Sequence, residues 1–367
     1  MSPTSRKARV RALTGLSALA LAATGFAAAP AAQADQPSSE FAGNSHPYRH
    51  GVVPTKEGAA HANAASAAAT RTSNLKYGGG VDGIGVTTGA PKVYVVIWGS
   101  QWGTAGTDAN GYTTMSGDPS GEAVRAQQLY KGLGTNNELW SGVLTQYCEG
   151  IAKGSTSCPS TAAHVGYPTG GALAGVWVDT SAAAPSQATG NQIATEAIAA
   201  AGHFGNTTAA SNRNAQYIVL SPTGTHPDGF NTSTGQFCAW HDWNGDTTLS
   251  GGAATSPYGD VAFSNNPYVT DMGASCGQNY VNTGNAGLLD GVTIVYGHEY
   301  AETVTDQNPA GGWTDSTGAE NGDKCAWKGT GGTGGAQNVN FSTGSFAMQA
   351  TWSNVNSSCQ ISHAIVP

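Results

Sequence analysis

The feature that most limits how this chain can fold is an alternation of short apolar segments with longer amphipathic ones. Residues 91–99, 175–180 and 215–222 are rich in β-branched and aromatic residues, with Gly or Pro at one end or both, which is typical of buried β-strands. Residues 120–134 and 186–203 lie between them and show partial apolar faces, which predicts helices. Strands that alternate with helices favour an α/β or α+β fold, in which helices flank a mixed, layered sheet.

The second half of the chain continues this pattern. Residues 237–243 and 261–269 predict two more strands. Residues 292–305 predict a helix of about four turns, with Asp290 as its N-cap. Gly accounts for 52 of the 367 residues and only 10% of the residues are charged, so we expect a loop-rich protein.

Residues 1–34 have the pattern of a secretory signal peptide. Basic residues near the start precede the apolar residues 13–29, and the small-x-small sequence at 32–34 predicts cleavage before Asp35. No later segment is apolar enough to span a bilayer. We therefore predict a secreted, extracellular protein without a membrane anchor after cleavage.

The next region, residues 35–80, is rich in Ala, Ser, Gly and Asn and contains few large apolar side chains. Such a composition is expected to bury too little surface to offset the entropy of ordering, so it predicts a linker or a propeptide. Residues 81–367 then form a single globular domain.

Six cysteines follow the predicted signal peptide, and an even number in a secreted chain indicates disulfides. Short loops close most readily, so we expect each cysteine to pair with its nearest neighbour in the sequence. The predicted pairs are Cys148–Cys158, Cys238–Cys276 and Cys325–Cys359. No C-x-x-C pair is present, which disfavours a metal site made of cysteines.

The charge distribution excludes two classes of partner. The formal net charge is −8, and removal of the basic signal peptide makes the chain more acidic. No cluster of Lys or Arg indicates binding to nucleic acid or to anionic lipid. We expect a monomer that acts on a peptide or on cell-wall material.

The segment "HEYAETVTD" is the strongest functional signal. His298, Glu302 and Asp306 are four residues apart, so on the predicted helix they form one polar stripe, with Glu299 beside it. Such a stripe is costly to bury unless its members share a cation. His298, Glu302 and Asp306 are therefore predicted metal ligands, and Glu299 is the predicted general base that takes a proton from the attacking water.

Further ligands come from elsewhere in the sequence. Glu320 and Asp323 lie on a Gly-rich loop next to a cysteine, and His241 lies between two tryptophans on a predicted strand. Zinc is the expected metal, and calcium is the alternative because the motif contains more carboxylates than imidazoles. A polar helix without a metal is the simpler interpretation.

Other chemistries were weighed against this one. The spacing Asp242-x-Asn244-x-Asp246 is similar to the start of a calcium loop, but the following Gly and the distal Glu are missing, which favours a plain turn. The G-x-S-x-G motif of serine hydrolases is absent from the sequence. A glycosidase with two opposed carboxylates remains open, since several glutamates cluster in this part of the sequence.

Several stretches together resemble a known family. These are "KVYVVIWG", "AQYIVLSPTGTH" with the following "GFNTSTGQFCAWHD", "HEYAETVTDQNPAGGWTD" with "GAENGDKC", and "NVNFSTGSFAMQATWSNVNSSC". They are similar to segments of the secreted phosphate-induced or exordium-type proteins of plants and their bacterial relatives. The resemblance implies an extracellular or wall-associated protein, and it does not imply an enzymatic activity.

The helix motif also resembles that of zincin metallopeptidases, with Glu302 where the second histidine would stand. The order of the predicted elements is similar to the zincin layout. Together these features predict a secreted metal-dependent hydrolase, most plausibly a zinc peptidase. The alternative is a non-catalytic exordium-like protein that binds wall glycan or a protein partner.

Overall fold

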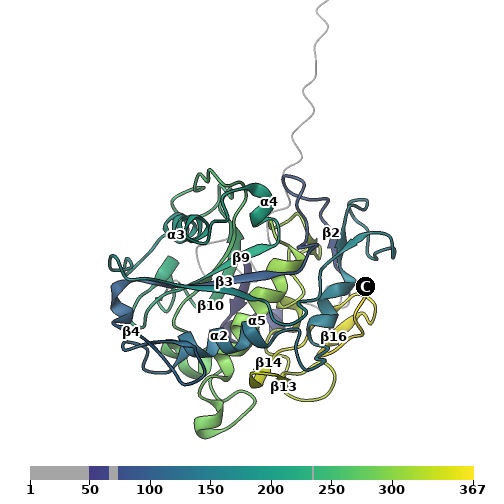
Figure 1. Cartoon of the computed structure of the whole chain (residues 1–367). Helices are drawn as coiled ribbons and strands as arrows, with labels where there is room; N and C mark the ends of the chain where they lie inside the picture. Colours follow the sequence, from purple (N-terminus) through teal and green to yellow (C-terminus); the bar gives the residue numbers. More distant parts are fainter. Residues whose placement is uncertain (1–48, 66–72, 234) are drawn as a thin grey trace, which may run out of the picture. The chain divides into compact units, whose positions relative to one another are not determined.

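A six-stranded mixed sheet forms the centre of the protein. The computed structural model describes residues 49–65, 73–233 and 235–367 (Figure 1), so the predicted signal peptide lies outside the described residues. The strand order is β1 (His50–Pro54), β10 (Phe237–Trp243), β11 (Ala262–Asn266), β9 (Ala215–Leu220), β3 (Lys92–Trp98) and β8 (Leu173–Asp179). Strand β10 is antiparallel to both of its neighbours, whereas β11, β9, β3 and β8 run parallel.

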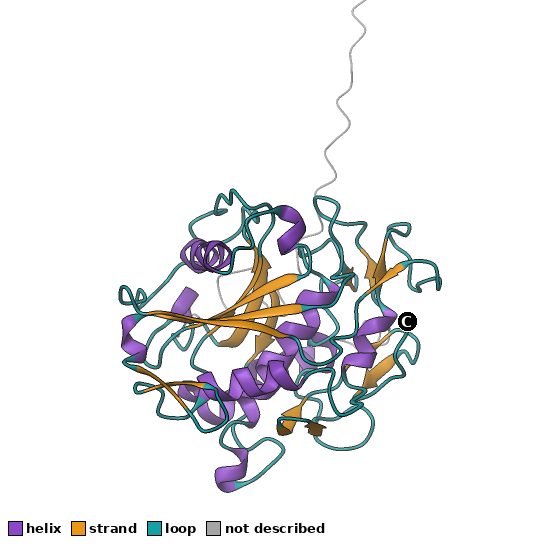
Figure 2. Ribbon diagram, in the orientation of Figure 1, coloured by secondary structure: helices purple, strands orange, loops and turns teal. Residues whose placement is uncertain are grey.

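Helices cover both faces of this sheet (Figure 2). Alternate residues of β3 separate the two layers: Val93 and Val95 pack in the cluster that contains α2 (Glu122–Gly132) and α5 (Asp290–Thr305), whereas Tyr94 packs in the cluster that contains α3 (Gly190–His203). Successive side chains of a strand point to opposite faces, and this strand is apolar throughout because both faces are buried. The predicted mixed fold of helices and sheet is confirmed.

Helix α5 is buried along its whole length. It lies between the sheet and strand β14 (Gly344–Met348), so its apolar residues are not confined to one stripe. The prediction that Asp290 caps this helix was wrong, because Leu289 is the N-cap and Asp290 is the first helical residue. The carboxylate of Asp290 instead accepts hydrogen bonds from the amides of Val281 and Asn282, which fixes the preceding loop.

Strand β1 comes from the region predicted to be a linker or propeptide. It adds to the edge of the sheet beside β10, and its residues Val52 and Val53 are 5% and 0% exposed. The expectation that this region buries little surface does not hold for β1. A composition average over residues 35–80 hides two adjacent valines, which are enough for one edge strand.

The remaining elements are short. Two are α-helices, α1 (Lys56–Ala65) and α4 (Ala209–Asn212). The 3₁₀ helices are η1 (Ser100–Trp102), η2 (Ser141–Gln146), η3 (Pro227–Gly229), η4 (Val269–Cys276), η5 (Gly284–Gly287) and η6 (Asp323–Cys325). The antiparallel strand pairs are β2 (Lys76–Tyr77) with β12 (Trp313–Thr314), β4 (Ala105–Thr107) with β5 (Thr113–Met115), β6 (Cys148–Glu149) with β7 (Ala163–His164), β13 (Gln337–Phe341) with β14 (Gly344–Met348), and β15 (Thr351–Ser353) with β16 (Ser358–Gln360). Across the described ranges, no helix is long and apolar enough to cross a membrane.

All three predicted disulfides are confirmed. They join Cys148 to Cys158, Cys238 to Cys276, and Cys325 to Cys359. Three disulfides fit an oxidising environment such as the extracellular space. Two of them hold the site described next, because Cys238 lies on β10 and Cys325 ends the loop that faces α5.

Candidate metal centre

Helix α5 supplies the first two side chains of the centre. His298 and Glu302 are one turn apart on the helix and are completely buried. Atom Nε2 of His298 lies 3.0 Å from Oε2 of Glu302. The predicted stripe therefore brings these two groups together inside the protein and not at its surface.

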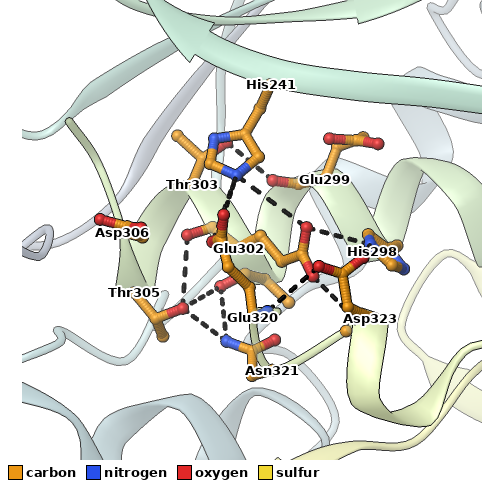
Figure 3. A network of polar contacts seen from close by, with 12 residues as sticks. His241, His298, Glu299, Glu302, Thr303, Thr305, Asp306, Glu320, Asn321 and Asp323 are labelled. Carbon is orange, nitrogen blue, oxygen red and sulfur yellow. Dashed lines mark hydrogen bonds and ion pairs between the residues drawn. The ribbon is translucent and has the colours of Figure 1, made fainter. Parts of the chain in front are cut away.

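The loop of residues 320–323 brings two more carboxylates against this helix (Figure 3). The side-chain amide of Asn321, in this loop, donates to the carbonyl oxygen of Ala301 and to the hydroxyl of Thr305. These two hydrogen bonds attach the loop to α5. Oδ1 of Asp323 then lies 3.6 Å from Nε2 of His298.

Gly322 allows this loop to approach the helix closely. A Cβ atom at this position would lie 2.8 Å from Oε1 of Glu302 and 2.9 Å from the ring of His298. Its φ of −76° is available to any residue, so the close contact with the side chains of Glu302 and His298 is what requires glycine here.

Strand β10 adds His241 from the opposite side. Its neighbour Trp240 packs in the cluster around α3, so alternation along the strand points the imidazole of His241 towards α5. Atom Nε2 of His241 lies 3.3 Å from both carboxylate oxygens of Glu320 and 3.9 Å from Oε2 of Glu302. Glu302 thus belongs to two groups of candidate ligands, one with His241 and Glu320 and one with His298 and Asp323.

Gln349 fixes the orientation and the tautomer of His298. Its Nε2 atom donates to the carbonyl oxygens of Gly322 and Ala350, so its Oε1 atom faces the imidazole. Atom Nδ1 of His298 lies 3.1 Å from that oxygen and therefore carries the proton that it donates. In the neutral ring, Nε2 is left with a lone pair directed at the carboxylates of Glu302 and Asp323, as in metal-bound histidines.

Several of these buried atoms have no hydrogen-bond partner among the described residues: Nε2 of His298, Oε2 of Glu302 and Oδ1 of Asp323. Their short separations place them around a common point, where a metal ion or a proton on Nε2 would relieve the repulsion between them. Ligand atoms about 2.0–2.1 Å from a tetrahedral zinc ion lie roughly 3.3 Å apart, and the observed separations of 3.0 and 3.6 Å are close to this value. The residues present therefore fit a metal ion.

The electrostatics of the centre also require a cation or bound protons. Burial, followed by the charge of Asp323, raises the pKa of Glu302 to about 7. Burial alone would lower the pKa of His298, but the carboxylate of Glu302 holds it well above its usual value. Burial and the charge of Asp306 raise the pKa of Glu320 well above its usual value. In the absence of a metal, protons must occupy the positions that a metal would take.

Glu299 lies beside the two groups of candidate ligands. Its carboxylate is completely buried, and neither oxygen has a hydrogen-bond partner in the described part of the chain. Figure 3 shows this carboxylate on the side of α5 that faces His241, with no dashed line reaching it. Burial raises the pKa of Glu299 well above its usual value, the charge of His298 lowers it, and Glu302 raises it further. A group with these properties can hold a proton next to a reacting molecule.

Asp306 belongs to neither group, although it continues the predicted stripe. The helix ends at Thr305, and Asp306 has non-helical backbone angles, with φ −145° and ψ 66°. Its carboxylate accepts hydrogen bonds from the amides of Ala310 and Gly312 at 2.9 and 2.5 Å, which stabilise the turn after the helix. The role of Asp306 as a ligand stays a prediction.

A third group lies on the neighbouring part of the sheet, where His50 meets Asp242 and Asp246. Nε2 of His50 lies 3.0 Å from Oδ2 of Asp246. The side chain of Asn244 bonds to the backbone of Ala254 and Val261. These contacts describe a turn that is held by side chains. The three groups could also hold a cation, so the preference for a plain turn over a calcium site stays a prediction.

No protein-family model matches this chain, and neither a curated protein nor a solved structure shows significant similarity to it. The resemblances to exordium-type proteins and to zincins therefore stay predictions.

Sequence reasoning missed two components of the centre. Gln349 lies 51 positions from His298, in the short connection between β14 and β15, and nothing in the sequence marks it as a partner. Gly51 was not singled out either, although a Cβ atom there would lie 2.1 Å from the ring of His241. The only signal in the sequence was the position of Gly51 directly before Val52 and Val53.

Proposed function

We propose that this protein is a secreted metal-dependent hydrolase, and that it is a zinc peptidase. The observation that carries the proposal is the buried Nε2 atom of His298, on which Oε2 of Glu302 and Oδ1 of Asp323 converge. It is completely buried and lies 3.0 Å from Oε2 of Glu302, while the opposite nitrogen of the ring is engaged by Gln349 among the described residues. Two acceptor atoms at this distance repel each other unless a cation or a proton lies between them.

Zinc is favoured over calcium because two imidazoles belong to the centre. Calcium binds oxygen ligands, whereas imidazole nitrogen is a ligand for zinc and for other transition metals. His298 and Glu302 are the main proposed ligands, with His241, Glu320 and Asp323 completing the set. The number of carboxylates that bind directly depends on how many keep their protons.

A bound metal would supply a Lewis acid that polarises the substrate carbonyl and activates water. The roles of the chain's own residues follow from their positions. The charge of a bound metal would lower the raised pKa of Glu299, so that its carboxylate would take a proton from the attacking water and give it to the leaving nitrogen. Gln349 keeps His298 in the tautomer that leaves Nε2 unprotonated.

The experiment is elemental analysis of the purified full-length protein together with a screen of peptide hydrolysis. We expect about one zinc per chain in the wild type and its loss in His298→Ala. His363→Ala is the matched control, because His363 lies near the C-terminus and belongs to none of the candidate groups. Glu299→Gln should retain the metal and lose roughly 10²–10⁴-fold in turnover.

Full activity of Glu299→Gln would refute its role as the base. If the wild type contains no metal and the histidine substitution changes nothing, the hydrolase proposal fails. A non-catalytic protein that binds wall glycan or a partner would then be the better interpretation of the exordium-type resemblance.

A further inference from the structure

Strand β1 lies directly on the candidate metal centre. It occupies the edge of the sheet beside β10, the strand that carries His241, and His50 is paired with His241 in the ladder. Gly51 follows with a φ of +52°, and a Cβ atom on it would lie 2.1 Å from Cδ2 of His241 and 2.4 Å from Oε2 of Glu302. Only a residue without a side chain fits here, so the main chain of β1 covers the side chains of His241 and Glu302.

Side chains hold both ends of β1 in this position. Arg49 forms an ion pair with Asp228 at 2.5 Å, and its guanidinium lies 4.4 Å from the centre of the Phe237 ring. At the other end, Nε1 of Trp327 donates to the carbonyl oxygen of Pro54 at 2.7 Å. The strand is therefore a specifically bound cover and not a loosely attached segment.

The two valines of β1 enter opposite layers of the protein. Val52 packs in the cluster that contains Phe237 and Trp240, and Val53 packs in the cluster that contains Ala239. The edge of β10 thus offers main-chain hydrogen bonds, a position for a residue without a side chain over the centre, and two apolar positions beyond it. These are the features by which a sheet edge recognises an extended peptide.

We propose that β1 is an inhibitory strand that occupies the peptide-binding edge of β10, and that its displacement opens this edge to an extended peptide substrate. The segment taken up in its place has glycine or another small residue at the position of Gly51 and aliphatic residues at the positions of Val52 and Val53. The substrate part of this proposal rests on the proposed peptidase function. The covering of β10 by β1 does not.

The test uses the full-length protein with Gly51→Val. A β-branched residue is strained at a positive φ, and its Cβ would overlap His241, so the strand cannot occupy its present position. Gly58→Ala is the matched control, since Gly58 lies in α1 and the nearest atom to its added Cβ is 3.3 Å away. Arg49→Gln is a milder second variant that removes the ion pair with Asp228, in case Gly51→Val does not fold.

Two readouts separate this proposal from the peptidase proposal. Hydrogen–deuterium exchange of residues 237–243 reports the covering of β10 without reference to activity. We expect faster exchange in Gly51→Val and Arg49→Gln, and a rate of peptide hydrolysis at least about tenfold above the wild type, because the competent fraction increases. A synthetic peptide of residues 49–58 should restore protection and inhibit both variants, whereas the same peptide with valine in place of glycine should do neither.

Each outcome has a definite meaning. Unchanged exchange of residues 237–243 in both folded variants, or measurable hydrolysis at the same rate by the variants and the wild type, would overturn the inhibitory role of β1 and leave the metal centre intact. Faster exchange that the added peptide reverses, without hydrolysis in the zinc-loaded variants, would support the covering by β1 and refute the peptidase.

Discussion

Replacing Gln349 by methionine tests the orientation of His298, on which the metal assignment depends. Methionine has a similar length and is apolar, so Gln349→Met removes the acceptor of the Nδ1 proton without opening a large space. Gln349 is 2% exposed, accepts from His298 at 3.1 Å, and donates to the carbonyl oxygen of Gly322 at 2.9 Å. The substitution therefore leaves the Nδ1 proton of His298 and the carbonyl oxygen of Gly322 without these partners, and it also removes the hydrogen bond to the carbonyl oxygen of Ala350 at 3.3 Å.

The expected magnitudes separate stability from metal binding. Each buried group that loses its partner costs about 1–3 kcal/mol of folding free energy, with or without a metal. In addition, loss of the group that orients a metal-bound histidine lowers metal affinity roughly 10- to 100-fold. The second effect is the specific one, because a purely structural role for Gln349 would not produce it.

The assay has two parts. Zinc affinity is measured by competition with a chelator, and the free energy of unfolding is measured by denaturant titration of the metal-free protein. Gln127→Met is the control: Gln127 is also 2% exposed and bonds to the backbone of Thr113 and Ala123. This control should lose stability and keep its zinc affinity. Equal zinc affinities for wild type and Gln349→Met would refute the assignment of the His298 tautomer.

Two further predictions follow from the centre. A metal must displace protons from His298 and Glu302, because the pKa values of both groups are raised and that of Glu302 is about 7. Zinc affinity should therefore fall as the pH drops below about 7, by roughly tenfold per pH unit for each proton that the metal displaces. Chelator competition at about pH 6 and about pH 8 measures this slope, and an affinity independent of pH would contradict the ligand set. Gly322→Ala places a Cβ 2.8 Å from Oε1 of Glu302 and should cost about 1–3 kcal/mol of unfolding free energy and weaken zinc binding. Gly58→Ala, whose Cβ meets no atom closer than 3.3 Å, should be neutral or slightly stabilising, and equal behaviour of the two variants in denaturant titration would show that the loop moves freely.

Local sequence patterns determined much of the fold. The continuous apolar run of β3 predicted a strand buried on both faces, and β10 has the predicted bounds of residues 237–243. The four-residue spacing of His298 and Glu302 predicted that they share one side of a helix. Nearest-neighbour pairing predicted all three disulfides. These predictions succeeded because each depends on residues that are close together in the sequence.

Only the tertiary structure decided which of the remaining polar residues join the centre. His241 and Glu320 are 79 positions apart and meet because β10 and the loop after α5 both pack against that helix. Asp306 fits the helical spacing, but the helix ends one residue earlier and the backbone turns away. The position of β1 likewise depends on the free edge of β10, which no local pattern in residues 49–65 encodes. Spacing along the chain constrains neighbours within one element, whereas contacts between elements depend on how the whole chain packs.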